Sequence, residues 1–507
     1  MNERKENMIT YSRFEHDYFN TYKYREPVSD DYRVFVNGEE IFVYTCRISK
    51  IPFNRAWPGH QREINQSEIA SFVNIISDEV IDIKVVVKKE FNKINISPKS
   101  KNIEYSIDGN EISFTLENEG QFVLSGDDLH NCLYIFNSKP IACDIDATYY
   151  FGPGVHMPGK IRLKDNESIY VDKDALVFGN VYAENAKNIR ILGNGIFDDS
   201  NEDRFCVHCY ENFTNGNVKF YDCENVAVEG VLLRNSAIWC VNVFHCKNVV
   251  LDNIKVFGQW RYNTDGVDIV NSRDITVKNS FVHSFDDTVT IKGIDRYIDT
   301  NNENILTENC VLWCDWGKTC EIGLETACRE YKNIIFRNCD IIRAGNTAID
   351  IQNGDCAEVY DIVFENINVE YNSFDNYPVL QENDESEYTA YGVPFVPNLV
   401  SLRNNRFRCE YYCDDIWGVP PEHSPLDLNG IKEACIHDIY IKNINVYYDE
   451  RIEKVDGKYN VPIKVCSLLD NVEFYNITVE NVIVNGTRID KDNSILTISG
   501  VKDFKFE

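Results

Sequence analysis

Residues 261–293 read RYNTDGVDIVNSRDITVKNSFVHSFDDTVTIKG and carry the clearest signal of the fold. Within them, short runs of alternating apolar and polar residues follow polar turns that contain Asn, Asp or Ser. Alternation at a period of two residues is typical of β-strands. Apolar residues at helical spacing are almost absent, so this region predicts a series of short strands.

A phrase of this kind, Asn or Asp followed by alternating apolar residues, recurs along most of the chain. It begins at Asn188, Asn225, Asn248, Asp274, Asn304, Asn333, Asp361, Asp438 and Asn476. Up to Asp361, successive phrases start 23 to 37 residues apart. A repeat of this length with strand period indicates a solenoid. We therefore expect an all-β chain in which residues 146–507 form a right-handed parallel β-helix with about three short strands in each coil.

The recurring Asn and Asp have a structural explanation that competes with a catalytic one. Both residues tolerate the left-handed backbone conformation and hydrogen-bond to neighbouring backbone, so stacked coils can reuse them at one corner. Most of them are therefore expected to make turns only.

Two regions depart from the repeat. Residues 1–145 read as short alternating strands between turn residues, which predicts an N-terminal β-sandwich domain that caps the N-terminal end of the solenoid. The interval between Asp361 and Asp438 is too long for one coil, so an insertion is predicted at about 371–430. Insertions in solenoids fall on one face, often the binding face.

Composition limits the partners of the chain. It has 51 Lys and Arg against 81 Asp and Glu, a formal net charge of −30, which repels nucleic acid and anionic membranes. No apolar run approaches the roughly 18–20 residues of a membrane span. The first residues lack the apolar core of a secretory signal. We expect no nucleic-acid or membrane partner and a cytoplasmic location, and we leave a homo-oligomer open.

The 18 cysteines are scattered, as expected of reduced core residues and not of a disulfide framework. Cys206-Val-His-Cys209 resembles half of a metal site, but no second pair completes four ligands. No metal and no cofactor are predicted.

Adjacent coils can be aligned by their apolar alternation. One aligned column contains Asn242, Asp268, Thr290, Glu321 and Asp350. Three positions earlier, the aligned residues are Trp239, Asp265, Asp287, Lys318 and Thr347. Because strands of neighbouring coils lie ~4.8 Å apart, Asp265 and Asp287 are predicted to be vertical neighbours. Asp286 would lie beside them on the turn, facing an open groove.

Three carboxylates at this distance raise one another's pKa and cost stability unless a cation or a function compensates. Every other coil manages its turn with a single Asn or Asp, so a catalytic role is favoured. Glycoside hydrolysis uses one protonated acid and one ionised base, and needs no Ser–His or Cys–His pair. Asp286 is predicted to be the acid, and Asp265 and Asp287 the pair that holds the attacking water, with Lys318 as the compensating cation.

The motifs NTDGVDI at 263–269 and FDDTVTIK at 285–292 resemble those of glycoside hydrolase family 28, the polygalacturonases. Family 49, which includes dextranases and isopullulanase, is similar in its three aspartates and its N-terminal β-sandwich. The resemblance covers roughly residues 150–370 and implies a pectin-lyase-like solenoid with an inverting mechanism. It also implies that Asp286 is the general acid and that Asp265 and Asp287 activate water.

Two motifs depart from the polygalacturonases. Lys318 stands where their Gly-His-Gly motif has histidine, and Ile349-Asp350-Ile351 replaces the Arg-Ile-Lys that grips a uronate. This loss of basic residues favours a neutral oligo- or polysaccharide, with a dextran-like α-glucan as the guess. Further candidates for contacts with the sugar, by ring stacking or hydrogen bonds, are Asn263, Trp260, Tyr262, Trp239, Lys292, Glu321 and Lys318 itself.

Other functions stay open. A pectin-type polysaccharide lyase would hold Ca²⁺ with the acids and use Lys318 as its base, and a uronide hydrolase would keep the acid and base roles. A non-catalytic carbohydrate-binding β-helix would scatter its acids over the coils. Chelator sensitivity with an ultraviolet-absorbing product would reveal the lyase, and glycan binding without released reducing ends would reveal the binder.

Overall fold

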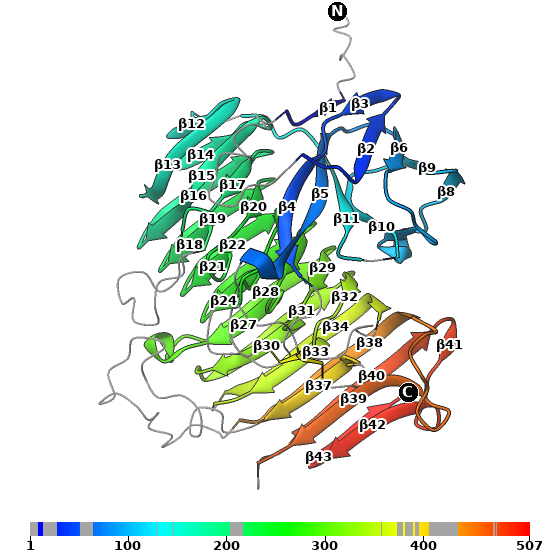
Figure 1. Ribbon diagram of the computed structural model, residues 1–507. Helices are drawn as coiled ribbons and strands as arrows, with labels where there is room; N and C mark the ends of the chain where they lie inside the picture. The colour runs from blue at the N-terminus through cyan, green and yellow to red at the C-terminus, as the bar shows by residue number, and fades with distance from the viewer. Residues whose placement is uncertain are drawn as a thin grey trace, which may run out of the picture.

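The fold is seen in a computed structural model. It describes residues 9–13, 28–50, 64–127, 129–143, 146–202, 216–355, 357–372, 379–380, 389–390, 395–404, 434–469, 472 and 474–507. In this part of the chain, 30 strands form one sheet that winds into a right-handed parallel β-helix, and two smaller sheets form an N-terminal sandwich (Figure 1). The predicted fold class is confirmed.

Each coil of the β-helix contributes strands to three faces. Face 1 contains β13 (Gly154–Leu163), β15 (Ala175–Glu184), β18 (Val218–Tyr221), β21 (Val241–Phe244), β24 (Val267–Val270), β27 (Val289–Gly293), β30 (Lys318–Thr326), β33 (Thr347–Asn353), β37 (Asn398–Asn404), β39 (Tyr459–Ser467) and β42 (Ser494–Ser499). Face 2 contains β12 (Tyr149–Phe151), β14 (Ser168–Val171), β16 (Lys187–Gly193), β19 (Glu224–Glu229), β22 (Lys247–Asp252), β25 (Arg273–Lys278), β28 (Asn302–Glu308), β31 (Glu330–Arg337), β34 (Glu358–Tyr371), β38 (Ile436–Tyr448), β40 (Phe474–Val484) and β43 (Val501–Phe506). Face 3 contains β17 (Ile196–Asp198), β20 (Leu232–Arg234), β23 (Lys255–Phe257), β26 (Phe281–Ser284), β29 (Val311–Cys314) and β32 (Asp340–Arg343).

The core of the β-helix is a stack of inward-pointing apolar residues. On face 1, Val218, Val241, Val267 and Val289 lie in register on four successive coils and are almost fully buried. Burying one such side chain contributes about 1.5–3 kcal/mol. The strands are too short to be stable alone, and their backbone N–H and C=O groups form hydrogen bonds with the strands of the coils above and below. Alternate residues on these strands therefore point outward, and on face 1 they line the site described below.

The recurring Asn and Asp occupy one corner, before the face 2 strands, in the left-handed conformation. Asn225, Asn248 and Asp274 have φ of 60°, 56° and 60°. Their side chains form a ladder in which Asn225 Nδ2 donates to Asn188 Oδ1 at 3.0 Å and Asn248 Nδ2 donates to Asn225 Oδ1 at 2.8 Å. The predicted turn role of these residues is confirmed.

The N-terminal domain consists of two packed sheets. One contains β1 (Thr10–Tyr11), β4 (Tyr44–Ser49), β5 (Ser67–Ile76), β7 (Asn95–Ser97), β10 (Gly120–Ser125) and β11 (Cys132–Ser138). The other contains β2 (Tyr32–Val36), β3 (Glu39–Ile41), β6 (Ile81–Val87), β8 (Tyr105–Asp108) and β9 (Glu111–Leu116). All pairings are antiparallel except β5 with β11. The short 3-10 segments η1 (Ile64–Gln66) and η2 (Lys99–Lys101) connect strands of this domain, and η3 (Asp295–Tyr297) follows β27 in the β-helix.

The sandwich packs along the side of the β-helix, so its predicted position as an end cap is wrong. Phe72 and Phe136 contact Phe257 of face 3, with ring centroids 5.0 and 5.3 Å apart. At the far end of the sandwich, Ser97 Oγ donates to Glu370 at 2.8 Å. Figure 1 shows β4, β5 and β11 lying beside the β-helix. Outward-facing aromatic residues on face 3 explain the contact, because they give the sandwich an apolar surface to cover.

The interval between Asp361 and Asp438 is not one continuous insertion. β37 lies within it and pairs with β33 on one side and β39 on the other, so it is a regular strand of face 1. A small hairpin of β35 (Val379–Leu380) and β36 (Thr389–Ala390) precedes it. Most of the predicted insertion at 371–430, and the Cys206–Cys209 pair, lie outside the described residues.

Candidate active site

The predicted register of face 1 is confirmed. Asn242 pairs with Asp268, Asp268 with Thr290, and Thr290 with Glu321, which in turn pairs with Asp350. The backbone just before these strands continues the stack: Gly266 N donates to Asp287 O at 2.8 Å, and Thr288 N donates to Lys318 O at 2.9 Å. Asp265, Asp287 and Lys318 therefore lie on three consecutive coils.

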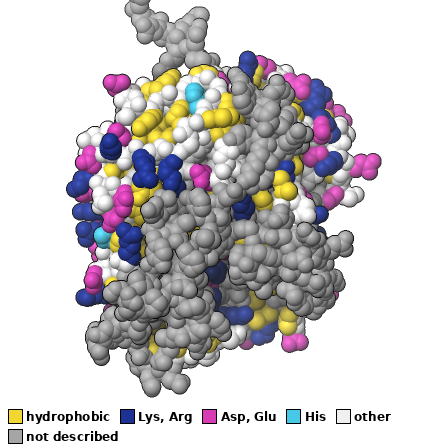
Figure 2. Space-filling model, turned by 60° about the vertical axis from the view of Figure 1, so that its left-hand side comes forward, with side chains coloured by type: hydrophobic (Ala, Val, Ile, Leu, Met, Phe, Trp, Pro, Cys, Tyr) yellow, Lys and Arg dark blue, Asp and Glu magenta, His cyan; other side chains and the backbone are white. Residues whose placement is uncertain are grey.

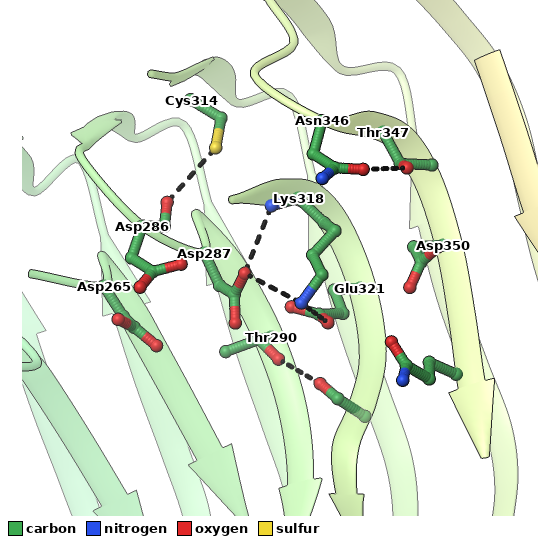
Figure 3. A network of polar contacts seen from close by, with 12 residues as sticks. Asp265, Asp286, Asp287, Thr290, Cys314, Lys318, Glu321, Asn346, Thr347 and Asp350 are labelled. Atoms are coloured by element: carbon green, nitrogen blue, oxygen red, sulfur yellow. Dashed lines mark hydrogen bonds and ion pairs between the residues drawn. The ribbon is translucent and has the colours of Figure 1, made fainter. Parts of the chain in front are cut away.

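The structure brings the three predicted aspartates together. In Figure 3, Asp265 and Asp287 lie on neighbouring coils and Asp286 beside them, with the carboxylates close to one another. Asp265 is 1% exposed, Asp286 7% and Asp287 5%. The prediction of an open groove around them is wrong, because all three side chains are almost fully buried. We call Asp265, Asp286 and Asp287 the acid trio. Because these residues are buried, the charge of each carboxyl group depends strongly on the cations beside it.

Lys292 is the main cation under the trio. Its Nζ lies 2.8 Å from Asp265, 3.2 Å from Asp268 and 3.5 Å from Asp287. The same Nζ lies over the ring of Trp239, 4.0 Å from its centroid. Lys292 is 3% exposed, so its predicted contact with a sugar hydroxyl is wrong. Residue alternation on β27 turns it outward beneath the carboxylates, where it neutralises them.

Lys318 contacts the trio from the next coil. Its backbone N–H donates to Asp287 Oδ1 at 3.1 Å, and its Nζ lies 3.4 Å from the same oxygen and 2.9 Å from Glu321. The side chain of Lys318 is 21% exposed, more than those of Lys292 and the three aspartates. Glu321 is fully buried, and its predicted contact with sugar is wrong because its carboxylate contacts Lys318.

The trio combines carboxyl groups of opposite protonation tendency. Burial raises the pKa of Asp286 well above its usual value, and the charges of Asp287 and Asp265 raise it further. Burial alone would also raise the pKa of Asp287, but Lys318 and Lys292 outweigh it and bring this pKa to about 2. Burial raises the pKa of Asp265 to about 6, although Lys292 opposes the shift. One carboxyl therefore tends to keep its proton while its neighbour in the chain is ionised.

Two neighbours hold the position of Asp286. Asn263 Nδ2 donates to Asp286 Oδ2 at 3.4 Å, and Asn263 itself is partly exposed with φ of 58°. Gly317 packs directly against the pair, since a Cβ at this position would lie 2.6 Å from Asp286 Oδ1 and 2.5 Å from Asp287 Oδ1. Only glycine leaves room for both carboxylates here.

The aromatic residues predicted as stacking platforms are packed inside the protein. Tyr262 is fully buried against Phe285 and Trp316, so its predicted role is wrong. Trp239 and Trp260 are only 4% and 3% exposed and offer no ring face to a pyranose. They form part of the support of the site, which sequence alternation alone cannot distinguish from an exposed platform.

The turn that carries Asp286 and Asp287 is anchored from the sandwich. The buried Asp315 lies 3.0 Å from His283 Nε2, and 3.2 Å from His130 Nε2 of the sandwich. His283 Nδ1 also hydrogen-bonds to the hydroxyl of Tyr134 at 2.7 Å. Burial would raise the pKa of Asp315, but the two histidines outweigh it and hold this pKa well below its usual value. His283, with both ring nitrogens in contact with protein groups, is thus a structural histidine.

Two further charged groups at the site have no role in the sequence prediction. Asp268 lies beside Lys292, and burial raises its pKa well above the usual value. Arg403 of β37 donates to Asp350 Oδ1 at 2.7 Å. Asp268 was visible in the aligned column, whereas Arg403 lies in the interval interpreted as an insertion. The next coil thus supplies a cation opposite the position where the polygalacturonase basic motif is lost.

The described residues contain no group of three or more His, Cys, Asp or Glu side chains arranged to hold a metal ion. They also contain no helix with the length and apolar character that a membrane crossing requires.

The model of the family described as glycosyl hydrolases family 28 matches residues 151–468. The chain belongs to glycosyl hydrolases family 28. This family hydrolyses O-glycosyl bonds, and the matched range contains the acid trio, Lys292 and Lys318.

Curated relatives in family 28 match over shorter stretches. A probable rhamnogalacturonase A of Aspergillus oryzae is 28% identical over 149 residues, which cover 29% of this chain and 30% of that protein. An exopolygalacturonase of Cochliobolus carbonum is 25% identical over 227 residues, covering 41% of this chain and 48% of that protein. The chain thus spans about half or less of these relatives.

Among solved structures, Dex49A from Penicillium minioluteum has the same architecture over almost the whole chain. The match covers 95% of both chains with a TM-score of 0.55 and 13% sequence identity. At this identity the likeness concerns the fold, and it extends over the sandwich as well as the β-helix.

Proposed function

We propose that this family 28 chain is an inverting glycoside hydrolase in which Asp286 is the general acid. Asp287, with Asp265, holds and activates the attacking water. The observation that carries the proposal is the opposite shift of two adjacent carboxyl groups, with the pKa of Asp286 well above its usual value and that of Asp287 at about 2. Separation of the pKa values of two neighbouring acids is how glycosidases assign acid and base roles.

The reaction follows from these protonation states. The Asp286 carboxyl donates its proton to the glycosidic oxygen as the bond to the anomeric carbon breaks. The water gives a proton to the carboxylate pair of Asp287 and Asp265 while its oxygen attacks the anomeric carbon from the opposite side, which inverts the configuration. Proton exchange with solvent then restores Asp286 and frees the base. Lys292 and Lys318 keep Asp287 ionised before the attack, so that the carboxylate pair can accept the proton of the water.

We further propose that the sugar at the cleaved bond is neutral. The three cations that pair with carboxylates of this column are already matched, Lys292 by three aspartates, Lys318 by Asp287 and Glu321, and Arg403 by Asp350. A uronate bound beside the trio would therefore add a charge to a buried acidic cluster in which the described part of the chain offers no unmatched cation. A dextran-like α-glucan remains our first neutral candidate.

A pectic substrate is the second candidate. It is supported by the relatives, whose names describe a rhamnogalacturonase and an exopolygalacturonase. In that case Lys318 or Arg403 would have to exchange a carboxylate of the protein for one of the substrate. The partial exposure of both side chains, 21% and 27%, permits such an exchange.

The decisive test is hydrolysis of a panel of isomaltose-type, pectic and mixed oligosaccharides by the unmodified protein and by Asp286→Asn. We expect cleavage of at least one neutral bond, loss of about 10³-fold in kcat in Asp286→Asn, and a freshly released anomer of inverted configuration in NMR spectra. Retention of configuration, or an undiminished Asp286→Asn variant, would refute the mechanism. Cleavage only between two uronates would refute the neutral substrate and leave the mechanism standing.

We also propose a reducing location such as the cytoplasm. The buried cysteines Cys223 and Cys246 lie next to each other on adjacent coils, where Cys223 N donates to Cys246 Sγ at 3.4 Å, and both are free thiols. Subcellular fractionation of the source cells, with thiol titration of the isolated protein, tests this. Recovery outside the cell with fewer free thiols than cysteines would contradict it.

A further inference from the structure

A second column of left-handed residues lies where face 1 ends, three positions before the ladder that contains Asn225. Its members have φ between 43° and 55° and are Asn185, Asp222, His245 and Asn271. The backbone N–H groups of Asp222 and His245 donate to carbonyl groups of the coil that follows, so these residues stack. On two adjacent coils, an acid and an imidazole therefore stand where the neighbouring coils have asparagine.

His245 links two side chains of different chemistry. Its Nδ1 lies 2.6 Å from Asp222 Oδ1, and its Nε2 lies 2.8 Å from Thr300 Oγ1. Because a carboxylate only accepts hydrogen bonds, Asp222 holds the ring proton of a neutral imidazole on Nδ1 and leaves the lone pair of Nε2 facing the threonine. Thr300 then donates its hydroxyl proton to Nε2. This order of hydroxyl, imidazole and carboxylate activates a hydroxyl group as a nucleophile.

Further contacts fix the positions of these three side chains. The ring of Tyr297 stacks on the imidazole of His245, with centroids 4.6 Å apart and planes 6° apart. The Tyr297 hydroxyl donates to the second carboxylate oxygen of Asp222 at 3.3 Å. The backbone of Thr300 donates to Tyr297 O at 2.8 Å and accepts from Asn271 Nδ2 at 3.1 Å. The hydroxyl, the imidazole and the carboxylate are thus held in place before any ligand binds.

His245 and Thr300 line a pocket of about 250 Å³ together with Lys247 and Arg273. The side chain of His245 is 37% exposed, so a ligand can reach its ring. Figure 2 shows histidine side chains at the surface, one of them among Lys, Arg and acidic side chains. The pocket is smaller than those that enclose drug-sized ligands, and it suits a small group such as an acyl ester.

The cations of this pocket are not matched by acids. Lys247 and Arg273 are neighbours in register on face 2, between Glu224 and Glu303. These two acids pair with other lysines at 2.8 and 3.2 Å, and Asp299, also in the pocket, lies 3.1 Å from an arginine outside it. Among the described residues, neither Lys247 nor Arg273 has a carboxylate within ion-pair distance. Negative charge that develops on a carbonyl oxygen in the pocket would therefore be stabilised.

We propose that this pocket is a second catalytic site, an esterase that removes a small acyl group from a sugar hydroxyl. Thr300 is the nucleophile, His245 is the base, and Asp222 is a positioning residue that holds the imidazole in the required tautomer. The esterase activity is independent of the acid trio. The choice of an acylated sugar as the substrate class rests on the proposed hydrolase function.

The reaction has two steps. Thr300 Oγ attacks the carbonyl carbon of the ester while its proton passes to Nε2 of His245, and the carbonyl electrons form an oxyanion beside Lys247 and Arg273. The oxyanion collapses and breaks the bond to the sugar oxygen, which takes the proton from Nε2 and leaves as a hydroxyl group. Water then attacks the acyl-threonine, gives a proton to Nε2, and releases the carboxylic acid as Thr300 recovers its hydroxyl proton.

The two sites lie at opposite edges of face 1. Asn271, the neighbour of His245 in the left-handed column, follows Asp265 by six residues of chain, which span at most about 20 Å. A glycan of a few residues can therefore contact both sites. Removal of an acyl group at one edge would prepare the glycan for cleavage at the other.

Ester hydrolysis by the purified protein tests the proposal. The probes are p-nitrophenyl acetate, followed by its coloured product, and glucose pentaacetate, followed by released acetate. Thr300→Val keeps the side-chain shape without the hydroxyl and should lower kcat about 10²-fold or more, as should His245→Ala, whereas Thr300→Ser should retain activity. Thr276→Val and His156→Asn are the matched controls, because both residues are partly exposed and lie outside the pocket. They should hydrolyse both esters at the unmodified rate.

Two further measurements examine the roles within the site. Acid quenching during turnover of p-nitrophenyl acetate should leave one acetyl group on the peptide that contains Thr300, detected by mass spectrometry. Asp222→Asn should lower kcat and leave KM unchanged, because the carboxylate orients the base and does not contact the ester. An acetyl group on another residue, or ester hydrolysis no faster than in Thr300→Val, would overturn the proposal.

The same variants separate this proposal from the glycosidase. Asp286→Asn should lose glycan cleavage and keep ester hydrolysis, and Thr300→Val should show the reverse. Loss of ester hydrolysis in Asp286→Asn would overturn the second site. Ester hydrolysis without cleavage of any glycan would overturn the glycosidase proposal and leave the esterase standing.

Discussion

Two corners of the same β-helix differ both in backbone geometry and in chemistry. Before the face 2 strands, successive coils repeat Asn or Asp in the left-handed conformation, and their side chains form an exposed amide ladder. Before the face 1 strands, the stacked residues change from Trp239 to Asp265, Asp287 and Lys318, and most are buried. Where every coil keeps the residue type, the residue serves the fold. Where residue types change from coil to coil and carry charge, the buried charges lower the stability of the fold and serve its function.

The largest effect is expected from neutralising the acid. Asp286→Asn should lower kcat by about 10³-fold, because the amide cannot protonate the leaving oxygen. The folded protein raises the pKa of Asp286, so this carboxyl destabilises the fold increasingly as pH rises above its pKa in the unfolded chain. The variant should therefore melt at a higher temperature than the unmodified protein at pH 7, and calorimetry should show the difference shrinking toward pH 4. A lower melting temperature at pH 7 would show that the charged corner stabilises the fold.

A smaller loss of activity is expected from adding a single methyl group. Gly317→Ala would place its Cβ within 2.6 Å of both Asp286 and Asp287 and displace their carboxylates. A misplacement of about 1 Å can cost about 10²-fold in rate. Gly126→Ala is the matched control, because its Cβ would meet only ordinary contacts at 3.5 Å or more. Full activity in Gly317→Ala, measured as kcat on the cleaved oligosaccharide, would mean that the pair tolerates movement.

The amide corner could be predicted from the sequence more completely than the charged one. Alternation and spacing give the register, and with it the stacking of Asp265 and Asp287, because a one-residue slip would turn the valines outward. Alternation says only that a side chain points outward, not whether another part of the chain covers it. Tyr262 and Trp239 were therefore predicted as sugar platforms although other side chains bury them. The anchoring of the trio through His130 needs contacts between residues far apart in sequence, which no local pattern contains.

Removing the cation at the position of the family's histidine should have an intermediate effect. Lys318 lowers the pKa of Asp287 to about 2, against the opposing effect of burial. Without it this pKa rises, so base catalysis fails at a higher pH than in the unmodified protein. Lys318→Met should lower activity about tenfold at pH 5 and less at pH 7, visible as an acid limb displaced to higher pH in the profile of kcat/KM. An unshifted acid limb would show that Lys292 alone keeps the base ionised.

The smallest effect on activity is expected at the amide corner. Asn248→Ala removes the hydrogen bond to Asn225 and places alanine at a φ of 56°, which together should lower the free energy of unfolding by about 1–2 kcal/mol. Because this ladder lies on another face and carries no charge at Asn248, kcat and the pH profile should remain unchanged. Urea unfolding measures the first effect, and the oligosaccharide assay the second. A changed pH profile would show that the two corners are electrostatically coupled through the coil, and that a residue repeated along the solenoid can also tune its active site.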